Sequence, residues 1–177
     1  MRRLFGLLSL VLAASVVASL VVAVAAGAGE HGVPFHAQIT LVSLSNTGPI
    51  ARCGSDPNVG YTSTYTGTGT HLGRITATET VCLDFAHFVV PNLPYTVYET
   101  FQAANGDTLI LVDTGNFNVA TMAFTDGVFA VTGGTGRFLH AHGGGSTVLS
   151  VDSDGSGHVT GVAYTGTLFY DASDRSG

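Results

Sequence analysis

Two glutamates occupy positions that the strand pattern otherwise fills with apolar side chains. Within residues 74–85 every second residue from 75 onward is apolar except Glu79, and Glu99 stands between Val97 and Phe101. Alternate residues of a strand share one face, so both carboxyl groups are predicted to point into a β-barrel. A carboxyl group in an apolar cavity has a raised pKa and can give or take a proton near neutrality. Glu79 and Glu99 are therefore the candidate catalytic residues, for an epoxide opening or a cyclisation.

This orientation depends on the strand register. A two-residue turn at Asn105-Gly106 would place Glu99 opposite Val112. A slip of one residue, or a β-bulge, would instead turn either glutamate toward solvent. The candidate ligand-binding residues nearby are Arg74, Tyr98, Phe101 and Phe129. Further aromatic residues either line the same pocket or pack in the barrel wall: Tyr61, Tyr65, Tyr95 and Tyr164.

Cys53 and Cys82 are the only cysteines. In an exported chain such a pair usually oxidises, so we predict a disulfide between them. Closing a loop of roughly 30 residues stabilises the fold by ~3–4 kcal/mol in the chain-entropy view. The competing interpretation is a free nucleophilic cysteine, but no His or Asp is recognisably placed beside either residue.

The histidines raise the question of a metal site. His140 and His142 are two residues apart and would share one face of a strand. Zinc needs a third ligand, and no spacing selects one among His36, His71 and His158. Residues 152–157 begin like a calcium loop but lack the glutamate at loop position 12, so a polar turn is the better interpretation. We therefore predict no metal site and no cofactor.

The stretch TGGTGRF at residues 132–138 has two interpretations. In a dinucleotide-binding fingerprint starting at Gly134 and Gly136, the third glycine position falls on Leu139, and His-Ala-His-Gly-Gly-Gly follows where a helix is needed. A phosphate-binding P-loop is excluded because the chain contains no Lys. The stretch is better interpreted as a glycine corner between two strands.

The same stretch resembles a segment shared by plant allene oxide cyclases and dirigent proteins. The resemblance rests on Gly133, Gly134, Gly136 and Phe138, and, more loosely, on the order of strands between Tyr61 and Tyr170. It implies an eight-stranded antiparallel β-barrel with a ligand cavity, commonly assembled as a homotrimer, and chemistry without a cofactor. His140 stands where that superfamily commonly has a small glycine. The motif marks the fold, so the activity does not transfer with it.

The elements that must position these residues are short strands. The chain has 24 Gly, no Trp and almost no run of helix formers at helical spacing. Strands are expected at residues 35–43, 60–67, 74–85, 95–103 and 108–113, on both sides of 133–136, and at 158–170. Seven or eight strands at hairpin spacing, with no crossover helices, indicate an all-β antiparallel barrel or sandwich.

The N-terminus indicates export. Arg2 and Arg3 precede an uncharged run of Leu, Val and Ala that extends to Ala28, which is typical of a signal-peptide helix. An uncleaved membrane anchor is the competing interpretation, because the run is long enough to span a bilayer. We divide the chain into a signal peptide (1–28), an N-terminal strand with a disulfide-tethered loop (29–58), the rest of one barrel domain (59–171) and a disordered tail (172–177).

After removal of residues 1–28 the chain keeps four Arg and twelve acidic residues, a formal charge of −8. Such a protein repels nucleic acids and anionic membrane surfaces, so neither is an expected partner. We expect a secreted barrel that binds an apolar small molecule, with a cofactor-independent cyclisation or isomerisation as the candidate activity. The alternative is a non-catalytic structural or interaction protein whose barrel is filled with its own side chains.

Overall fold

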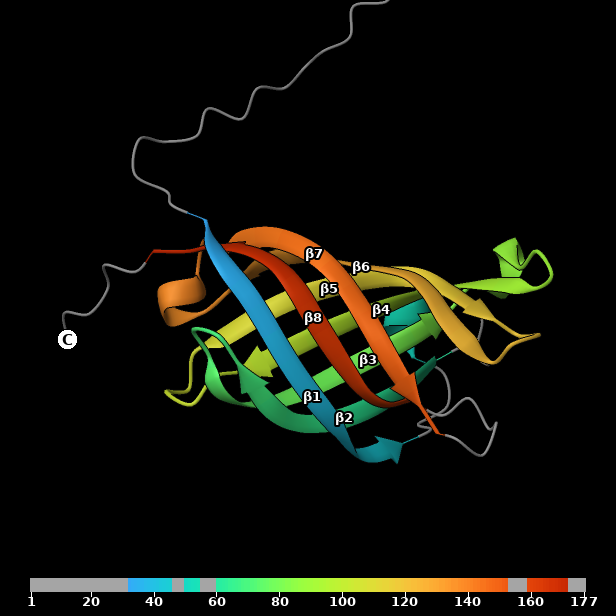
Figure 1. Cartoon of the computed structure of the whole chain (residues 1–177), viewed down its shortest axis with the longest axis horizontal. Coiled ribbons are helices and arrows are strands. Elements are labelled where there is room, and N and C mark those ends of the chain that lie inside the picture. Colours follow the sequence, from blue (N-terminus) through green and yellow to red (C-terminus); the bar gives the residue numbers. More distant parts are fainter. Residues whose placement is uncertain (1–31, 46–49, 55–59, 153–158, 172–177) are drawn as a thin grey trace, which may run out of the picture.

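The protein is a closed β-barrel of eight antiparallel strands in sequence order (Figure 1). The computed structural model describes residues 32–45, 50–54, 60–152 and 159–171. The strands are β1 (Val33–Ser45), β2 (Gly60–Gly69), β3 (Gly73–Leu83), β4 (Asn92–Gln102), β5 (Thr108–Asn118), β6 (Ala123–Gly134), β7 (His142–Val151) and β8 (Val159–Phe169). Each strand pairs with its neighbours in sequence, and β8 returns to β1. The predicted all-β antiparallel barrel is confirmed, whereas a two-sheet sandwich is not formed.

Strict alternation of side chains builds the barrel wall. In β3, Ile75, Ala77 and Val81 are buried inside, while Thr76 and Thr78 face outward. β-branched residues such as these threonines suit a pleated surface with one solvated face. The inward side chains form two apolar clusters, a large one around Phe35, Phe101 and Leu111 and a small one around Val81, Tyr95 and Val97. The candidate site lies between these clusters.

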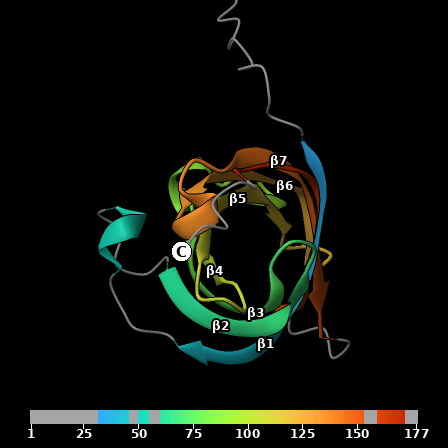
Figure 2. The same ribbon diagram turned by 90° about the vertical axis from the view of Figure 1, so that its left-hand side faces the viewer.

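One end of the barrel is closed by the glycine corner. Between β6 and β7 the chain makes the short 3-10 helix η3 (Gly136–Phe138), which lies at one end of the barrel (Figure 2). Its Phe138 is fully buried in the large cluster. Gly133 and Gly136 have φ of 132° and 56°, values that favour glycine. Arg137 donates a hydrogen bond to the His71 carbonyl oxygen and lies 3.6 Å from an Asp107 carboxylate oxygen. The glycine corner is thus confirmed, and Arg137 ties together the loops at this closed end.

The β4–β5 hairpin differs from the prediction by one residue. Glu99 pairs with Leu111 and not with Val112, because the turn is longer than the two residues expected from Asn105-Gly106. The Ala103 amide donates to the Asp107 carbonyl oxygen at 2.8 Å, and the Gly106 amide donates to the Ala103 carbonyl oxygen at 2.9 Å. Gly106 alone takes a positive φ, 91°, so the turn is a three-residue loop that ends in a glycine.

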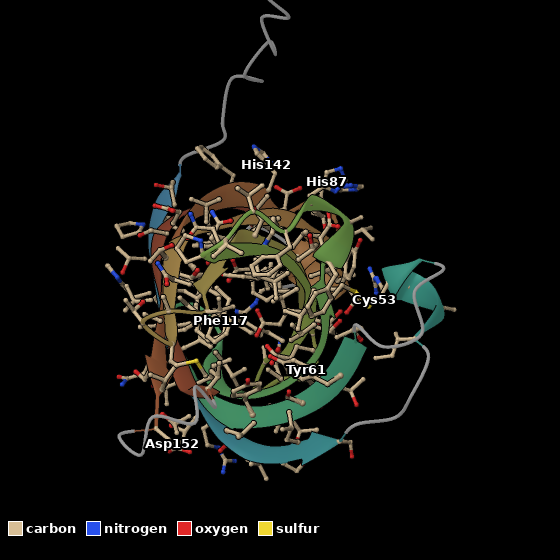
Figure 3. All side chains as sticks on the ribbon, turned by 90° about the vertical axis from the view of Figure 1, so that its right-hand side faces the viewer. Cys53, Tyr61, His87, Phe117, His142 and Asp152 are labelled. Carbon is tan, nitrogen blue, oxygen red and sulfur yellow. A yellow bond between two sulfur atoms is a disulfide. The ribbon has the colours of Figure 1, made fainter. Side chains whose placement is uncertain are left out.

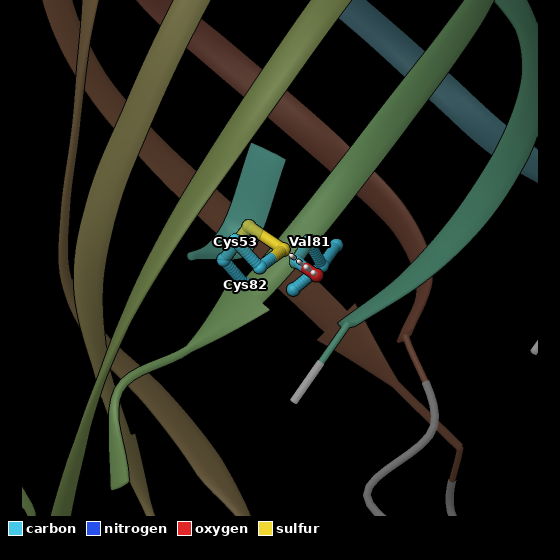
Figure 4. Close-up of a disulfide and its surroundings, with 3 residues drawn as sticks. All are labelled: Cys53, Val81 and Cys82. Carbon is cyan, nitrogen blue, oxygen red and sulfur yellow. Dashed lines mark hydrogen bonds between the residues drawn. A yellow bond between two sulfur atoms is a disulfide. The ribbon is translucent and has the colours of Figure 1, made fainter. Parts of the chain in front are cut away.

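The predicted disulfide is confirmed. Cys53 ends the short 3-10 helix η1 (Ala51–Cys53), and Cys82 lies near the end of β3 (Figure 4). The bond closes a sequence separation of 29 residues and holds η1 against the outside of the barrel. The cysteines are therefore structural, which rules out the free nucleophile.

Other boundary predictions have mixed outcomes. Phe85, expected in a strand, lies in the 3-10 helix η2 (Phe85–His87) and is half-exposed. The expected signal peptide at 1–28, the tail at 172–177 and most of the acidic turn at 152–157 lie outside the described residues. Within the described ranges, no helix has the length and hydrophobicity needed to cross a membrane.

Candidate functional site

Glu79 and Glu99 meet inside the barrel. They are direct partners in the β3–β4 ladder, and only 7% and 1% of their respective surfaces are exposed. The Tyr65 hydroxyl donates to Glu79 Oε1 at 2.6 Å, and the Tyr164 hydroxyl donates to Glu99 Oε2 at 2.7 Å. Both glutamates therefore point inward as the alternation predicted, and each is held by a phenol from another strand.

A third carboxyl group, on Asp113, joins this pair. Asp113 lies inward on β5, opposite Val97, and is 3% exposed. Asp113 is not among the predicted site residues, because the predicted register places Val112 opposite Glu99 and therefore puts Val112, and not Asp113, on the inner face. The signal was present in the alternation of Leu109, Leu111 and Asp113, which repeats the pattern around Glu79. Three acidic side chains thus project inward from three consecutive strands.

Burial raises the pKa of all three carboxyl groups. Desolvation is the largest cause in each case, and the neighbouring Glu79 carboxylate further raises the pKa of Glu99 and Asp113. The pKa of Asp113 rises to about 7, and that of Glu99 lies well above its ordinary value. The nearby Thr147 hydroxyl opposes the rise at Asp113, although its geometry falls short of a hydrogen bond. Protonated and ionised carboxyl groups can therefore coexist here near neutral pH.

Several buried polar atoms in this layer have no hydrogen-bond partner among the described residues. They are Glu99 Oε1, Asp113 Oδ1, Ser63 Oγ, Thr147 Oγ1 and the Tyr95 hydroxyl. Buried polar atoms are almost always paired in native proteins, so a concentration of five in one layer requires an explanation. Such a layer can accept hydrogen bonds from, and donate them to, a guest molecule.

Glycines allow Tyr95 to reach this layer. A Cβ atom at Gly115 would lie 2.5 Å from the Tyr95 hydroxyl oxygen, and one at Gly127 would collide with the Thr147 hydroxyl. The missing side chains on β5 and β6 thus leave space for the Tyr95 ring to lie across the inner wall. The ring also makes an edge contact with Phe124 at 5.5 Å. Tyr95 therefore links the carboxyl layer to the aromatic residues beyond it.

The two sides of the carboxyl layer differ in how deeply their inward side chains are buried. Toward η3 the barrel is filled by fully buried side chains such as Phe35, Phe101 and Leu168. Toward the opposite end, which we call the open end, the inward side chains are only partly buried: Tyr61, Leu83, Phe117, Phe124 and Leu149. Figure 3 looks into this end, with Tyr61 and Phe117 inside the ring of strands. The inward side chains are therefore less deeply buried on the open-end side of the carboxyl layer than on the η3 side.

The candidate ligand-binding residues divide between the inside and the outside. Phe101 and Phe129 are buried inside, and both make edge contacts with the Tyr164 ring. Tyr98 faces outward with the Arg52 guanidinium 3.9 Å from its ring centroid. Arg74 lies in an outer groove of about 750 Å³ beside β1 and β8. Only Phe101 and Phe129 therefore share the barrel interior with the glutamates, and neither Tyr98 nor Arg74 reaches it.

The histidines that the structure describes lie outside the barrel, and His158 falls outside the described residues. His140 and His142 are exposed next to the closed end, and the His142 ring stacks on Phe169 at 4.8 Å. Among the described residues, no three His, Cys, Asp or Glu side chains are close enough together to hold a metal ion. The described arginines are also outside or at the closed rim, so the carboxyl layer faces no cationic side chain of this part of the chain.

No model of a known protein family matches the chain, and no curated protein matches it. Any function of this protein therefore has to be inferred from the carboxyl layer and from the barrel that encloses it.

Proposed function

We propose that the protein is an exported barrel that binds an apolar small molecule through its open end, with the carboxyl layer as the floor of the binding site. The observation that carries the proposal is the set of five unpartnered polar atoms buried beneath a partly exposed aromatic wall. Binding sites for small molecules are mostly apolar with a few convergent polar groups, and the mouth of a β-barrel is a common place for them. The open end has both features.

The carboxyl pair also suits a cofactor-independent cyclisation or isomerisation of the bound molecule. A protonated carboxyl group of the Glu79–Glu99 pair would donate its proton to a developing oxyanion, such as an opening epoxide. The ionised partner would take a proton from carbon, so the pair ends with the same number of protons. Burial raises the pKa of both glutamates, which favours retention of a proton on the pair and supports these roles.

The resemblance to allene oxide cyclases and dirigent proteins is consistent with this proposal. The glycine corner closes the barrel at η3, as expected for a motif that marks the fold. We extend the proposal to a homotrimer on the same basis. Native mass spectrometry of protein purified from its secretion medium would report the assembly and any retained molecule together.

A filled barrel is the second candidate, and the closed half favours it. Phe35, Phe101 and Phe138 are completely buried there, so that half has no space for a guest. If the open half packs equally tightly in solution, the protein is a structural or interaction module. The two candidates therefore differ only in what the open half contains.

A size-increasing substitution in the open half separates the two candidates. Val97 is buried and faces inward between Tyr95 and Glu99, so Val97→Phe would place an aromatic ring next to the carboxyl layer, where the proposed ligand binds. We expect Val97→Phe to lose binding of the neutral apolar dye Nile red, whereas Val128→Phe, on the exposed outer face of β6, keeps it. Equal dye binding by both folded variants, or none by the parent protein, would contradict a ligand site in the open half.

A further inference from the structure

We infer that the ligand carries a positively charged amine on an apolar body, and that the amine binds the carboxyl layer formed by Glu79, Glu99 and Asp113. This inference rests on the proposed function, because it names the chemical class of the molecule bound at the same site. It is carried by three features of the layer, which are its charge, its unpartnered hydroxyl groups and its balance of donors and acceptors.

The first feature is the sign of the charge. Three acidic side chains project inward from β3, β4 and β5. The polar side chains that surround them inside the described part of the barrel carry hydroxyl groups: Ser63, Tyr65 and Tyr61 on β2, Tyr95 on β4, Thr147 on β7 and Tyr164 on β8. The described arginines lie elsewhere: Arg52 packs on the outer face of Tyr98, Arg74 lies in an outer groove, and Arg137 is bound at the closed rim. A buried carboxylate without a counter-ion is costly, so a cation entering this layer would be stabilised by it.

The second feature is a set of buried hydroxyl groups beside the acids. Ser63, Tyr95 and Thr147 are 3%, 3% and 6% exposed, and the hydroxyl oxygen of each has no hydrogen-bond partner among the described residues. Ser63 lies beside Glu79, while Tyr95 and Thr147 lie beside Asp113, so all three point into the same layer. These hydroxyl groups lie beside the carboxyl groups but fall short of hydrogen-bond geometry, so a polar group of another molecule can complete the layer.

The third feature is the balance of donors and acceptors. Tyr65 and Tyr164 already donate to one oxygen of each glutamate, which leaves Glu99 Oε1 and Asp113 Oδ1 as unpartnered oxygens. An alkylammonium group has three N–H donors and no acceptor. It can satisfy both carboxylate oxygens and one hydroxyl oxygen, and it supplies the missing positive charge. A carboxylate ligand would instead add a further negative charge to the layer.

Binding of an amine should change the number of protons that the protein holds. When an alkylammonium ion binds a protonated Glu99 or Asp113, that carboxyl group releases its proton to the solvent and an ion pair forms. No covalent bond is made or broken. Binding should therefore release up to one proton at neutral pH, which calorimetry in two buffers of different ionisation enthalpy can count.

The test compares three probes with the same chain length: octylamine, octanol and octanoate. With the intact protein we expect octylamine to bind at least about tenfold more tightly than octanol, a difference of ~1.4 kcal/mol, and octanoate to bind most weakly. Octanol and octanoate binding as tightly as octylamine would overturn the inference while leaving the proposed function intact. Binding of none of the three would overturn both.

Conservative variants identify the layer as the source of the preference. Glu99→Gln and Asp113→Asn keep the shape of each side chain but remove its charge, so each should lose most of the preference for octylamine over octanol. Asp84→Asn removes an acid on the outer surface next to η2 and should keep the full preference. If Asp84→Asn weakens octylamine binding as much as the two interior variants, the amine binds the acidic surface and the inference is wrong.

Discussion

Glu79 and Glu99 stand directly opposite each other in the β3–β4 ladder, with both carboxyl groups buried inside the barrel. Like charges in this arrangement destabilise a sheet. The fold accommodates the pair because Tyr65 and Tyr164 each donate a hydrogen bond to one member, and because burial raises the pKa of both. The number of protons held by this pair therefore links the stability of the barrel to pH.

We expect the barrel to be less stable at pH 8 than at pH 5. In the unfolded chain the carboxyl groups ionise near pH 4, whereas in the fold Glu79, Glu99 and Asp113 have a raised pKa. Stability is therefore greatest at low pH and is lost as the pH rises through the folded pKa of each group. For Asp113, whose pKa is about 7, the total loss is on the order of 4 kcal/mol, of which about 2–3 kcal/mol falls between pH 5 and pH 8.

Urea unfolding at a series of pH values measures this dependence. Asp113→Asn should flatten the profile between pH 5 and pH 8, because the amide does not titrate. Asp84→Asn is the matched control, since its exposed carboxyl group has a lowered pKa and contributes only at more acidic pH. A stability that rises from pH 5 to pH 8 would show that these carboxyl groups are not buried in solution.

The Tyr164–Glu99 hydrogen bond should give a coupling energy between the two residues in a double-mutant cycle of unfolding. Tyr164→Phe removes the only donor to Glu99 among the described residues, which should cost about 1–3 kcal/mol. Glu99→Leu leaves the phenol unpaired instead. The double variant removes both partners and should be more stable than the sum of the two single losses implies. Purely additive effects in a denaturation series would show that the hydrogen bond contributes nothing.

The sequence predicted the orientation of the glutamates because orientation depends only on alternation within each strand. Ile75, Ala77 and Val81 define the inner face of β3, and Glu79 lies in phase with them whatever the turn is. The partner of Glu99 depends in addition on the length of the turn, and a loop ending in Gly106 moved the register by one residue. Alternation survives an error in the turn, whereas cross-strand pairing does not.

Contacts across the barrel could not be predicted in the same way. Tyr164 is 65 residues from Glu99 in sequence, and the two meet only because β8 closes the barrel against β1. Tyr98 and Arg74, two of the predicted ligand-binding residues, lie outside the barrel for a related reason. Both are residue types common in binding sites, but each is out of phase with the inner face of its own strand. A strict test of phase would have excluded them and would have included Asp113.

The disulfide should stabilise the barrel by ~3–4 kcal/mol, because it closes a loop of about 30 residues in the unfolded chain. We expect a reducing agent to lower the unfolding midpoint of the intact protein in urea. The double variant Cys53→Ala/Cys82→Ala should be equally destabilised and should not respond to the reducing agent. An unchanged midpoint on complete reduction would show that the link adds nothing to the stability of η1 and β3.

A comparison of two positive-φ glycines at the closed end, Gly106 and Gly136, separates backbone strain from steric conflict. Gly106→Ala meets no atom within 4 Å of its new Cβ, so its cost comes only from a φ of 91°, about 1–2 kcal/mol. Gly136→Ala adds a Cβ that collides with the Asp107 carboxylate. Because Asp107 also faces Arg137, the new methyl group should displace that ion pair and expose the edge of Phe138. We therefore expect the free energy of unfolding, measured in urea, to fall more for Gly136→Ala than for Gly106→Ala.

The control is the double variant Gly136→Ala/Asp107→Ala, compared with Asp107→Ala alone. Here the extra cost of Gly136→Ala should shrink, because the carboxylate that collides with the new Cβ is gone. Equal losses for the two single variants would mean that the glycine corner tolerates a side chain, and that the buried Phe138 closes the barrel without help from the Asp107–Arg137 contact.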